Sequence, residues 1–222
     1  MSWVTTFLNS SIGKKFVMAT TGLLLCIYLI IHLAGNLTLF AGADFFNNYV
    51  LTLSAFKPII RVIEVILLLL FAGHIYSGLR LSIENRRVAG GKYESNRASE
   101  NSSLTSRTMT ITGSILLIFL IVHLVTIWYN FQIEHEGGQF FKIITGSTVG
   151  LGNMLVAILY GVAMVLLGFH LHHGFQSAFQ TFGVRYNRYG KLIEMVSILF
   201  WFFIPAGFFS LVIYFGFMGG AK

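Results

Sequence analysis

Met18-Ala19-Thr20-Thr21-Gly22, with His32-Leu33 after nine further residues, is repeated as Met109-Thr110-Ile111-Thr112-Gly113, with His123-Leu124 after nine. Two other segments each carry a His-x-x-x-Gly, one at His74 and Gly78 and one at His170 and Gly174. All four histidines lie in strongly apolar segments, where an imidazole is costly and rarely without a function. They therefore predict metal centres, most simply two haems that are each held by two histidines.

Five apolar segments are each long enough to cross the roughly 30 Å hydrocarbon core of a membrane, which takes about 20 helical residues. They run over about Lys15–Phe40, Pro58–Glu84, Arg107–Phe131, Leu151–Gln180 and Lys191–Phe217. The chain of 222 residues is 55% hydrophobic and 10% charged, with a mean hydropathy of +0.76. We expect an all-α fold over residues 1–222 as a single domain. It would be an integral membrane bundle of five transmembrane helices, four of which enclose two stacked haems.

The composition excludes several kinds of site. Cys26 is the only cysteine and lies within the first apolar segment. Disulfides, cysteine-based zinc sites, iron–sulfur clusters and covalently attached haem are therefore excluded within this chain. Any haem must be held non-covalently.

The net charge of +7 reports the orientation of the chain rather than a nucleic-acid partner. Most of the 15 Lys and Arg residues fall on one side of the expected membrane, namely Lys14, Lys15, Arg80, Arg86, Arg87, Lys92, Arg97, Arg107, Arg185, Arg188 and Lys191. The other side holds Lys57, Arg61, Lys142 and Lys222. This positive-inside pattern predicts a cytoplasmic N-terminus and an outside C-terminus, and no binding of nucleic acid.

The depth of each histidine follows from the helical rise of about 1.5 Å per residue. His32 and His123, on helices one and three, fall at the same height, about 25 Å above the inner surface. His74 and His170, on helices two and four, both fall near the inner surface. We therefore expect His32 to pair with His123 at an outer level and His74 with His170 at an inner level. By the same count the two levels are roughly 15–20 Å apart.

Four glycines are expected to let helix backbones approach the flat haems. Gly78 and Gly174 each follow their histidine by one turn on the same helix face. Gly22 and Gly113 lie ten residues before the outer histidines, at the height of the inner haem. A residue without a side chain permits close approach at these points.

Several secondary assignments depend on weaker patterns. On helix four His172 lies off the face of His170 and His173 lacks the following glycine, so both are left to contact a haem propionate or to cap the inner end. Propionates need cations or hydroxyls at the membrane edge. We expect Ser106 and Arg107 for the inner haem with Lys15 and Arg80 as alternatives, and Arg61 or Lys142 for the outer haem. Each of these is also explained as an interface residue whose polar end reaches water.

Glu64 is an ionisable residue about 9 Å below the outer surface, near the level of the outer haem. Such a group within a membrane is a functional candidate. A carboxylate there suits proton exchange with a quinone, because quinone reduction and oxidation move protons. The alternative is a structural ion pair with Arg61, three residues earlier on the same helix.

Further motifs give the chain a resemblance to a known family. They are Lys15-x-x-Met18-Ala19-x-Thr21-Gly22-Leu23, His32-Leu33-x-Gly35-Asn36-Leu37, Phe46-Asn47-x-Tyr49, Asn85-Arg86 and His170-x-x-x-Gly174-x-x-Ser177-x-Phe179. With them the chain resembles the cytochrome b membrane anchor of succinate dehydrogenase and fumarate reductase. The likeness is to the single-polypeptide, five-helix form that carries two haems b.

The resemblance implies a function and a set of partners. It implies a flavoprotein subunit and an iron–sulfur subunit on the cytoplasmic face, and a place in the bacterial cytoplasmic membrane. Electrons would pass between the flavin, the iron–sulfur clusters, the inner haem, the outer haem and a membrane quinone, expected to be menaquinone. The family's four axial ligands correspond to His32, His74, His123 and His170. Some members carry a glutamate two residues before the helix-four ligand, and Gly168 stands there in this chain.

Two other function classes share part of this pattern. A dihaem cytochrome b anchor of another respiratory enzyme, such as hydrogenase or formate dehydrogenase, would use the same bis-histidine pairs with a different catalytic subunit. A transporter with histidines as proton relays would bind no haem. Whether the complex forms a higher oligomer is left open.

Overall fold

The structure, a computed structural model, describes residues 3–89, 104–133, 138–184 and 189–220. Within these ranges every regular element is a helix and there is no strand. Five helical spans are long and apolar enough to cross a membrane: Ser11–Ala41, Lys57–Asn85, Thr108–Ile133, Met154–Thr181 and Gly190–Phe217. Each expected helix agrees with its span to within about one turn. The expected all-α membrane bundle of five helices is therefore confirmed.

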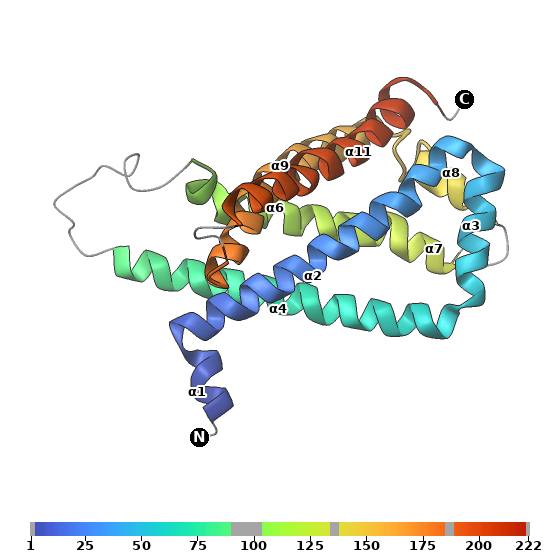
Figure 1. Cartoon of the computed structure of the whole chain (residues 1–222). Coiled ribbons are helices and arrows are strands. Elements are labelled where there is room, and N and C mark those ends of the chain that lie inside the picture. The colour runs from blue at the N-terminus through green and yellow to red at the C-terminus, as the bar shows by residue number, and fades with distance from the viewer. Residues whose placement is uncertain (1–2, 90–103, 134–137, 185–188, 221–222) are drawn as a thin grey trace.

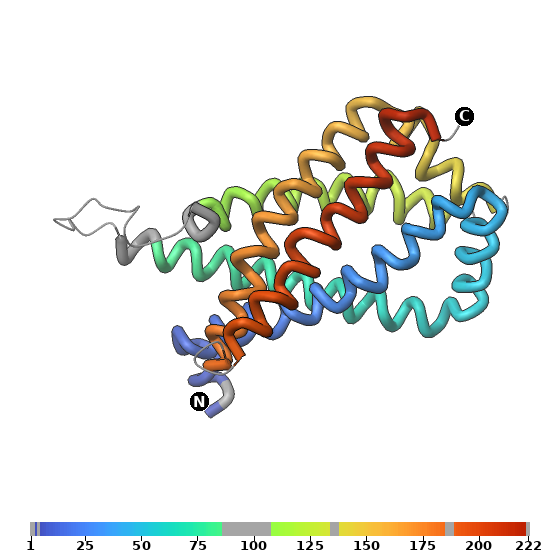
Figure 2. The backbone as a smooth tube through the Cα atoms, turned by 45° about the horizontal axis from the view of Figure 1, so that its top comes forward, coloured from blue at the N-terminus to red at the C-terminus, as the bar shows by residue number. Residues whose placement is uncertain are grey.

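Four of the spans surround the middle of the bundle, and their contacts are uneven. The helices are α2 (Ser11–Leu37), α4 (Lys57–Ala89), α6 (Leu104–His123) and α9 (Met154–Thr181). α2 packs along both α4 and α9, and α9 packs along α6, whereas α4 and α6 contact each other at few points. The two ends of the chain lie at opposite ends of the bundle, as five crossings require (Figures 1 and 2). The side between α4 and α6 is thus the thinly packed side of the bundle.

Short helices cover the end of the bundle at which α2 finishes. After the 3₁₀ turn η1 (Thr38–Ala41), Gly42 adopts a φ of 93°, and the chain then forms α3 (Ala43–Ala55). α8 (Phe140–Thr145) packs beside α3, where the Phe141 N–H donates to Asn47 Oδ1 at 2.8 Å. Leu39 and Phe46 belong to the apolar cluster beneath these two helices. The segment between the first two spans therefore forms a helix of its own that closes this end (Figure 1).

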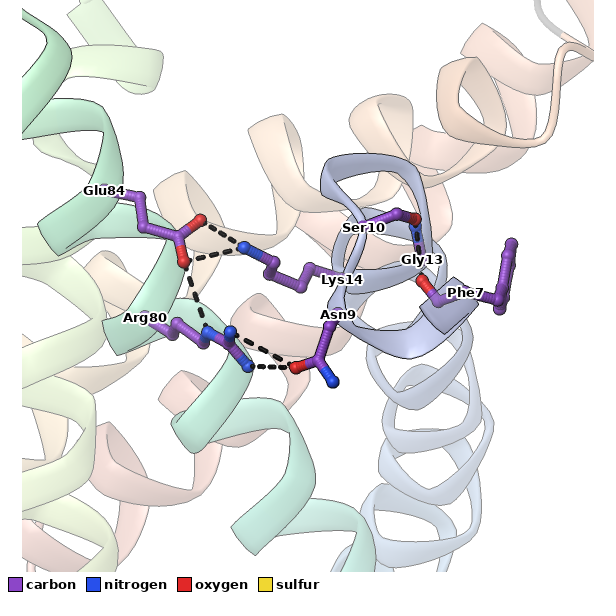
Figure 3. A network of polar contacts seen from close by, with 7 residues as sticks. All are labelled: Phe7, Asn9, Ser10, Gly13, Lys14, Arg80 and Glu84. Carbon is purple, nitrogen blue, oxygen red and sulfur yellow. Dashed lines mark hydrogen bonds and ion pairs between the residues drawn. The ribbon is translucent and has the colours of Figure 1, made fainter. Parts of the chain in front are cut away.

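At the opposite end a polar network ties the start of the chain to α4. The short helix α1 (Trp3–Asn9) precedes Ser10, whose hydroxyl accepts from the Gly13 N–H at 3.0 Å and caps α2. Lys14 Nζ donates to both carboxylate oxygens of Glu84, at 2.7 and 2.6 Å. Arg80 donates to Glu84 at 3.2 Å and to Asn9 Oδ1 at 3.3 Å (Figure 3). One carboxylate thus holds a cation from α2 and one from α4.

The fifth span is irregular around Pro205. It consists of α10 (Gly190–Ile198), the π-helical turn η3 (Leu199–Phe203), α11 (Ile204–Leu211) and the π-helical η4 (Val212–Phe217). Pro205 has no N–H, so the Trp201 carbonyl four residues earlier loses its usual α-helical donor. The helix takes π geometry there, and the Trp201 carbonyl lies against α9 at Gly168. A Cβ on Gly168 would come within 3.0 Å of that oxygen.

This contact predicts that Gly168→Ala destabilises the packing of the fifth span on α9. Overpacking of this kind costs about 1–3 kcal/mol. Unfolding of the detergent-solubilised protein, followed by circular dichroism, measures the loss. Gly161→Ala is the matched control on the same helix, because a Cβ there meets Phe209 at an ordinary 3.4 Å. Equal stability of the two variants would contradict the close approach.

Candidate functional site

The four membrane histidines lie in the structure as two neighbouring pairs. The ring centres of His32 on α2 and His123 on α6 are 5.8 Å apart, with their planes at 87°. Those of His74 on α4 and His170 on α9 are 6.3 Å apart, with their planes at 69°. All four side chains are half-buried. The structure thus brings together the residues that the depth count paired, and ligation of a metal by them remains a prediction.

The separation of each pair fits a metal ion between the two rings. An ion bound to one nitrogen of each imidazole at about 2.0 Å separates the ring centres by roughly 6 Å. Two neutral imidazoles and no thiolate or carboxylate form a donor set that suits haem iron. Among the described residues no group of three or more His, Cys, Asp and Glu is placed to hold a metal ion. The fit is therefore to an iron that brings its other ligands with it, as haem iron does.

Threonine hydroxyls accompany the inner pair. Thr21 Oγ1 lies 3.3 Å from His74 Nδ1, and Thr112 Oγ1 lies 3.5 Å from His170 Nδ1. The two threonines hold the same position in the repeated sequence. Each threonine contacts a histidine on the adjacent helix: Thr21 of α2 contacts α4, and Thr112 of α6 contacts α9.

Tyrosine hydroxyls accompany the outer pair. Tyr28 lies one turn before His32 on α2, and its hydroxyl is 3.4 Å from His32 Nδ1. The Tyr160 hydroxyl of α9 is 3.2 Å from His123 Nδ1 and 3.2 Å from Thr126 Oγ1. All four histidines therefore have an Nδ1 contact with a hydroxyl, which is the arrangement that orients metal-binding imidazoles.

The four expected glycines fall into two kinds. A Cβ on Gly22 would lie 3.2 Å from Cε1 of His74, and one on Gly113 would lie 3.4 Å from Cε1 of His170. These two glycines are therefore at the inner level, beside the inner imidazoles. Gly78 and Gly174 instead face methionine methyl groups of the repeated sequences, Met18 at 3.3 Å and Met109 at 3.8 Å.

Glu64 is held from two helices. Arg61 Nη1 donates to Glu64 Oε2 at 2.6 Å, so the structural ion pair is present. Trp128 Nε1 donates to the other carboxylate oxygen at 2.8 Å, and Arg61 Nη2 also donates to Gln132 Oε1. Trp128 belongs to the π-helical turn η2 (Leu124–Trp128) and Gln132 to α7 (Tyr129–Ile133), so these contacts join α4 to the third span.

An apolar hollow lies beside this cluster. It has a volume of about 340 Å³ and is lined by Leu124, Val125, Trp128 and Tyr129. Trp128 lines the hollow and also donates to Glu64. Neither Trp128 nor Gln132 was singled out from the sequence. The sequence does show that the two residues are one turn apart near the outer end of the third span, so that they share a helix face.

The other expected residues that the structure describes lie apart from the two pairs. The side chains of Ser106 and Arg107 lie outside the part of the chain that can be described. Lys15 and Lys142 are exposed, and Arg80 belongs to the network around Glu84. The His172 ring packs edge-on against Trp201 at 5.2 Å between ring centres, on the side of the fifth span.

We predict a measurable coupling between Glu64 and Trp128. A double-mutant cycle of Glu64→Gln and Trp128→Phe should give an interaction free energy of about 0.5–1.5 kcal/mol, as for other hydrogen bonds between membrane helices. Unfolding by a denaturing detergent measures it. Replacing Trp3, an exposed tryptophan on α1, by Phe in the same cycle is the control and should show no coupling. Additive effects of Glu64→Gln and Trp128→Phe would contradict the hydrogen bond between the two side chains.

Comparison with known proteins gives one family match, over part of the chain. Residues 16–104 match the family model of the succinate dehydrogenase/fumarate reductase transmembrane subunit. No curated protein and no solved structure matches the chain. The matched residues include His32 and His74 and cover less than half of the sequence. This match supports, over residues 16–104, the resemblance that the motifs show to this family of membrane subunits. The five long apolar helices fit a multi-pass membrane protein.

Proposed function

We propose that this chain is the dihaem cytochrome b anchor of a succinate:quinone oxidoreductase. It would pass electrons between an iron–sulfur subunit on the cytoplasmic face and a quinone in the membrane. His74 and His170 would hold the inner haem b, and His32 and His123 the outer one. The family match supports the class of complex. The observation that carries the haem part is the pair of neighbouring imidazoles at each of two levels.

The levels are spaced along the bundle by the helices themselves. Gly22 lies against the His74 ring and precedes His32 by ten residues on α2. At about 1.5 Å per residue the inner and outer pairs are about 15 Å apart along that helix. A haem bound at each level would supply one-electron oxidation and reduction. The residues of this chain would fix the positions of the haems, and the apolar spans that carry the half-buried rings would limit the access of water.

At the outer end Glu64 is the proposed group for proton exchange with quinone. Its carboxylate lies between the Arg61 guanidinium and the Trp128 indole, and the apolar hollow begins at Trp128. A quinone ring against this hollow would be near a carboxylate that can take up and release a proton. Menaquinone is the expected substrate.

The catalytic chemistry on succinate or fumarate belongs to the partners in this proposal. A flavoprotein subunit and the iron–sulfur subunit would dock on the basic side of the bundle. That side carries Lys14, Lys15 and Arg80, with the N-terminus, and faces the cytoplasm by the positive-inside rule. The complex would lie in a bacterial cytoplasmic membrane.

The first test is the haem content. Purified protein should contain two b-type haems per chain, because each imidazole pair would hold one. A pyridine haemochrome assay against protein concentration measures the ratio. One haem per chain would reject one of the two levels, and none would reject the dihaem proposal. Co-purification of a flavin-containing subunit separates this complex from other dihaem enzymes.

The second test is the pairing. His74→Ala and His170→Ala should each remove the inner haem and leave the outer one, because each removes one of two axial ligands. Redox-difference spectra of the α band at low temperature distinguish the two haems. His172→Ala, which changes a neighbouring histidine that packs on Trp201, should retain both. Loss of different haems from the first two variants would overturn the assignment.

A further inference from the structure

We infer that Thr21 and Thr112 are positioning residues of the inner site: their hydroxyl oxygens accept the Nδ1–H of His74 and His170 and leave Nε2 of each ring for a metal. This inference rests on the proposed haem function and deepens it. It follows from where the single hydrogen of each hydroxyl goes. Equivalent contacts occur in both halves of the chain.

In the first half the Thr21 hydroxyl is already used as a donor. Thr21 Oγ1 donates to the Val17 carbonyl at 2.8 Å, with the Met18 carbonyl at 3.2 Å. A hydroxyl has one hydrogen and two lone pairs. With its hydrogen on the helix backbone, Thr21 meets His74 Nδ1 at 3.3 Å as an acceptor, next to the Met18 carbonyl, which also accepts from the His74 ring. The proton of the neutral His74 ring is therefore on Nδ1, and Nε2 carries the free lone pair.

In the second half Thr112 has the same arrangement. Thr112 Oγ1 donates to the Met109 carbonyl at 3.1 Å and lies 3.5 Å from His170 Nδ1. It is again the acceptor, so Nε2 of His170 is again the unprotonated nitrogen. The two ligands of one site thus receive the same tautomer from equivalent residues of the repeat. A metal between the rings needs this tautomer on both sides.

His123 receives the same tautomer through a chain of two hydroxyl groups. The Thr126 hydroxyl donates to the Val122 carbonyl at 2.8 Å, so its oxygen accepts from the Tyr160 hydroxyl at 3.2 Å. The Tyr160 oxygen then accepts the Nδ1–H of His123 at 3.2 Å. The outer site therefore uses a tyrosine where the inner site uses threonines.

The consequence for the inner haem is a defined electronic effect. An Nδ1–H hydrogen bond raises the basicity of a coordinating imidazole and so favours the oxidised metal. Removing the acceptor should shift the midpoint potential of that haem upward. Because Thr21 and Thr112 each contact an inner ligand, either change should act on the inner haem alone.

The experiment compares three valine variants of the purified, haem-loaded protein. Valine keeps the shape of threonine and removes the hydroxyl. Thr21→Val and Thr112→Val should each shift the midpoint potential of one and the same haem upward in a redox titration. The low-spin signal of that haem in electron paramagnetic resonance should change with it, as the imidazole is freed to rotate.

Thr20→Val is the matched control. Thr20 adjoins Thr21 on α2, is turned from it by about 100°, and its buried hydroxyl has no hydrogen-bond partner among the described residues. It should leave both haems unchanged. Thr21→Ser, which restores the hydroxyl, should return the potential of Thr21→Val toward that of the unchanged protein.

The outcomes are distinct. Thr21→Val could also lose the inner haem and keep the outer one. If Thr21→Ser then regains the inner haem, this result supports a positioning role for Thr21, as a shifted midpoint potential would. Thr21→Val and Thr112→Val behaving like Thr20→Val, or shifting both haems equally, overturns the inference and leaves the haem proposal standing. The haem content of the unsubstituted protein is measured before any variant is made. Absence of haem from that protein overturns the proposed function itself.

Discussion

The rest of the bundle depends on how an imidazole is accommodated in hydrocarbon. A neutral ring has one N–H and one lone pair, and leaving either without a partner away from water costs free energy. Here the Nδ1 of each of the four rings contacts a hydroxyl from α2, α6 or α9. The helices must therefore hold fixed rotations about their axes. That requirement explains why hydroxyl residues, glycines and histidines recur at the same spacing in two spans.

The pairs also explain the uneven packing of the four surrounding helices. Each pair joins helices that are not the closest neighbours, α2 with α6 and α4 with α9. The side between α4 and α6 is held near its ends by polar contacts: Arg61 and Glu64 with Gln132 and Trp128 at one end, and Ser82 with Thr110 at 3.0 Å at the other. Between apolar helices in lipid, hydrogen bonds of this kind are a main source of specific association.

Much of this could be predicted from the sequence because membrane spans obey simple geometry. Hydropathy fixes the spans, and a constant rise per residue fixes which histidines share a height. Rotation is harder. The π-helical η2 holds more residues per turn than an α-helix, so side chains beyond His123 are turned by roughly 100° from an α-helical count. The contact of Trp128 with Glu64 follows from that turn and could not be read from spacing. α3 likewise lies outside the five apolar segments that hydropathy marks.

The family match ends within the first half of the chain, yet the internal repeat connects the second half to it. Thr21 with His74 lies inside residues 16–104, and Thr112 with His170 lies outside. The two contacts are nonetheless the same contact made by equivalent residues on different pairs of helices. The proposed metal site would need both sets, since one imidazole alone would leave the metal half-ligated. The structural equivalence, rather than similarity to other proteins, is therefore the reason to propose the same role for α6 and α9 as for α2 and α4.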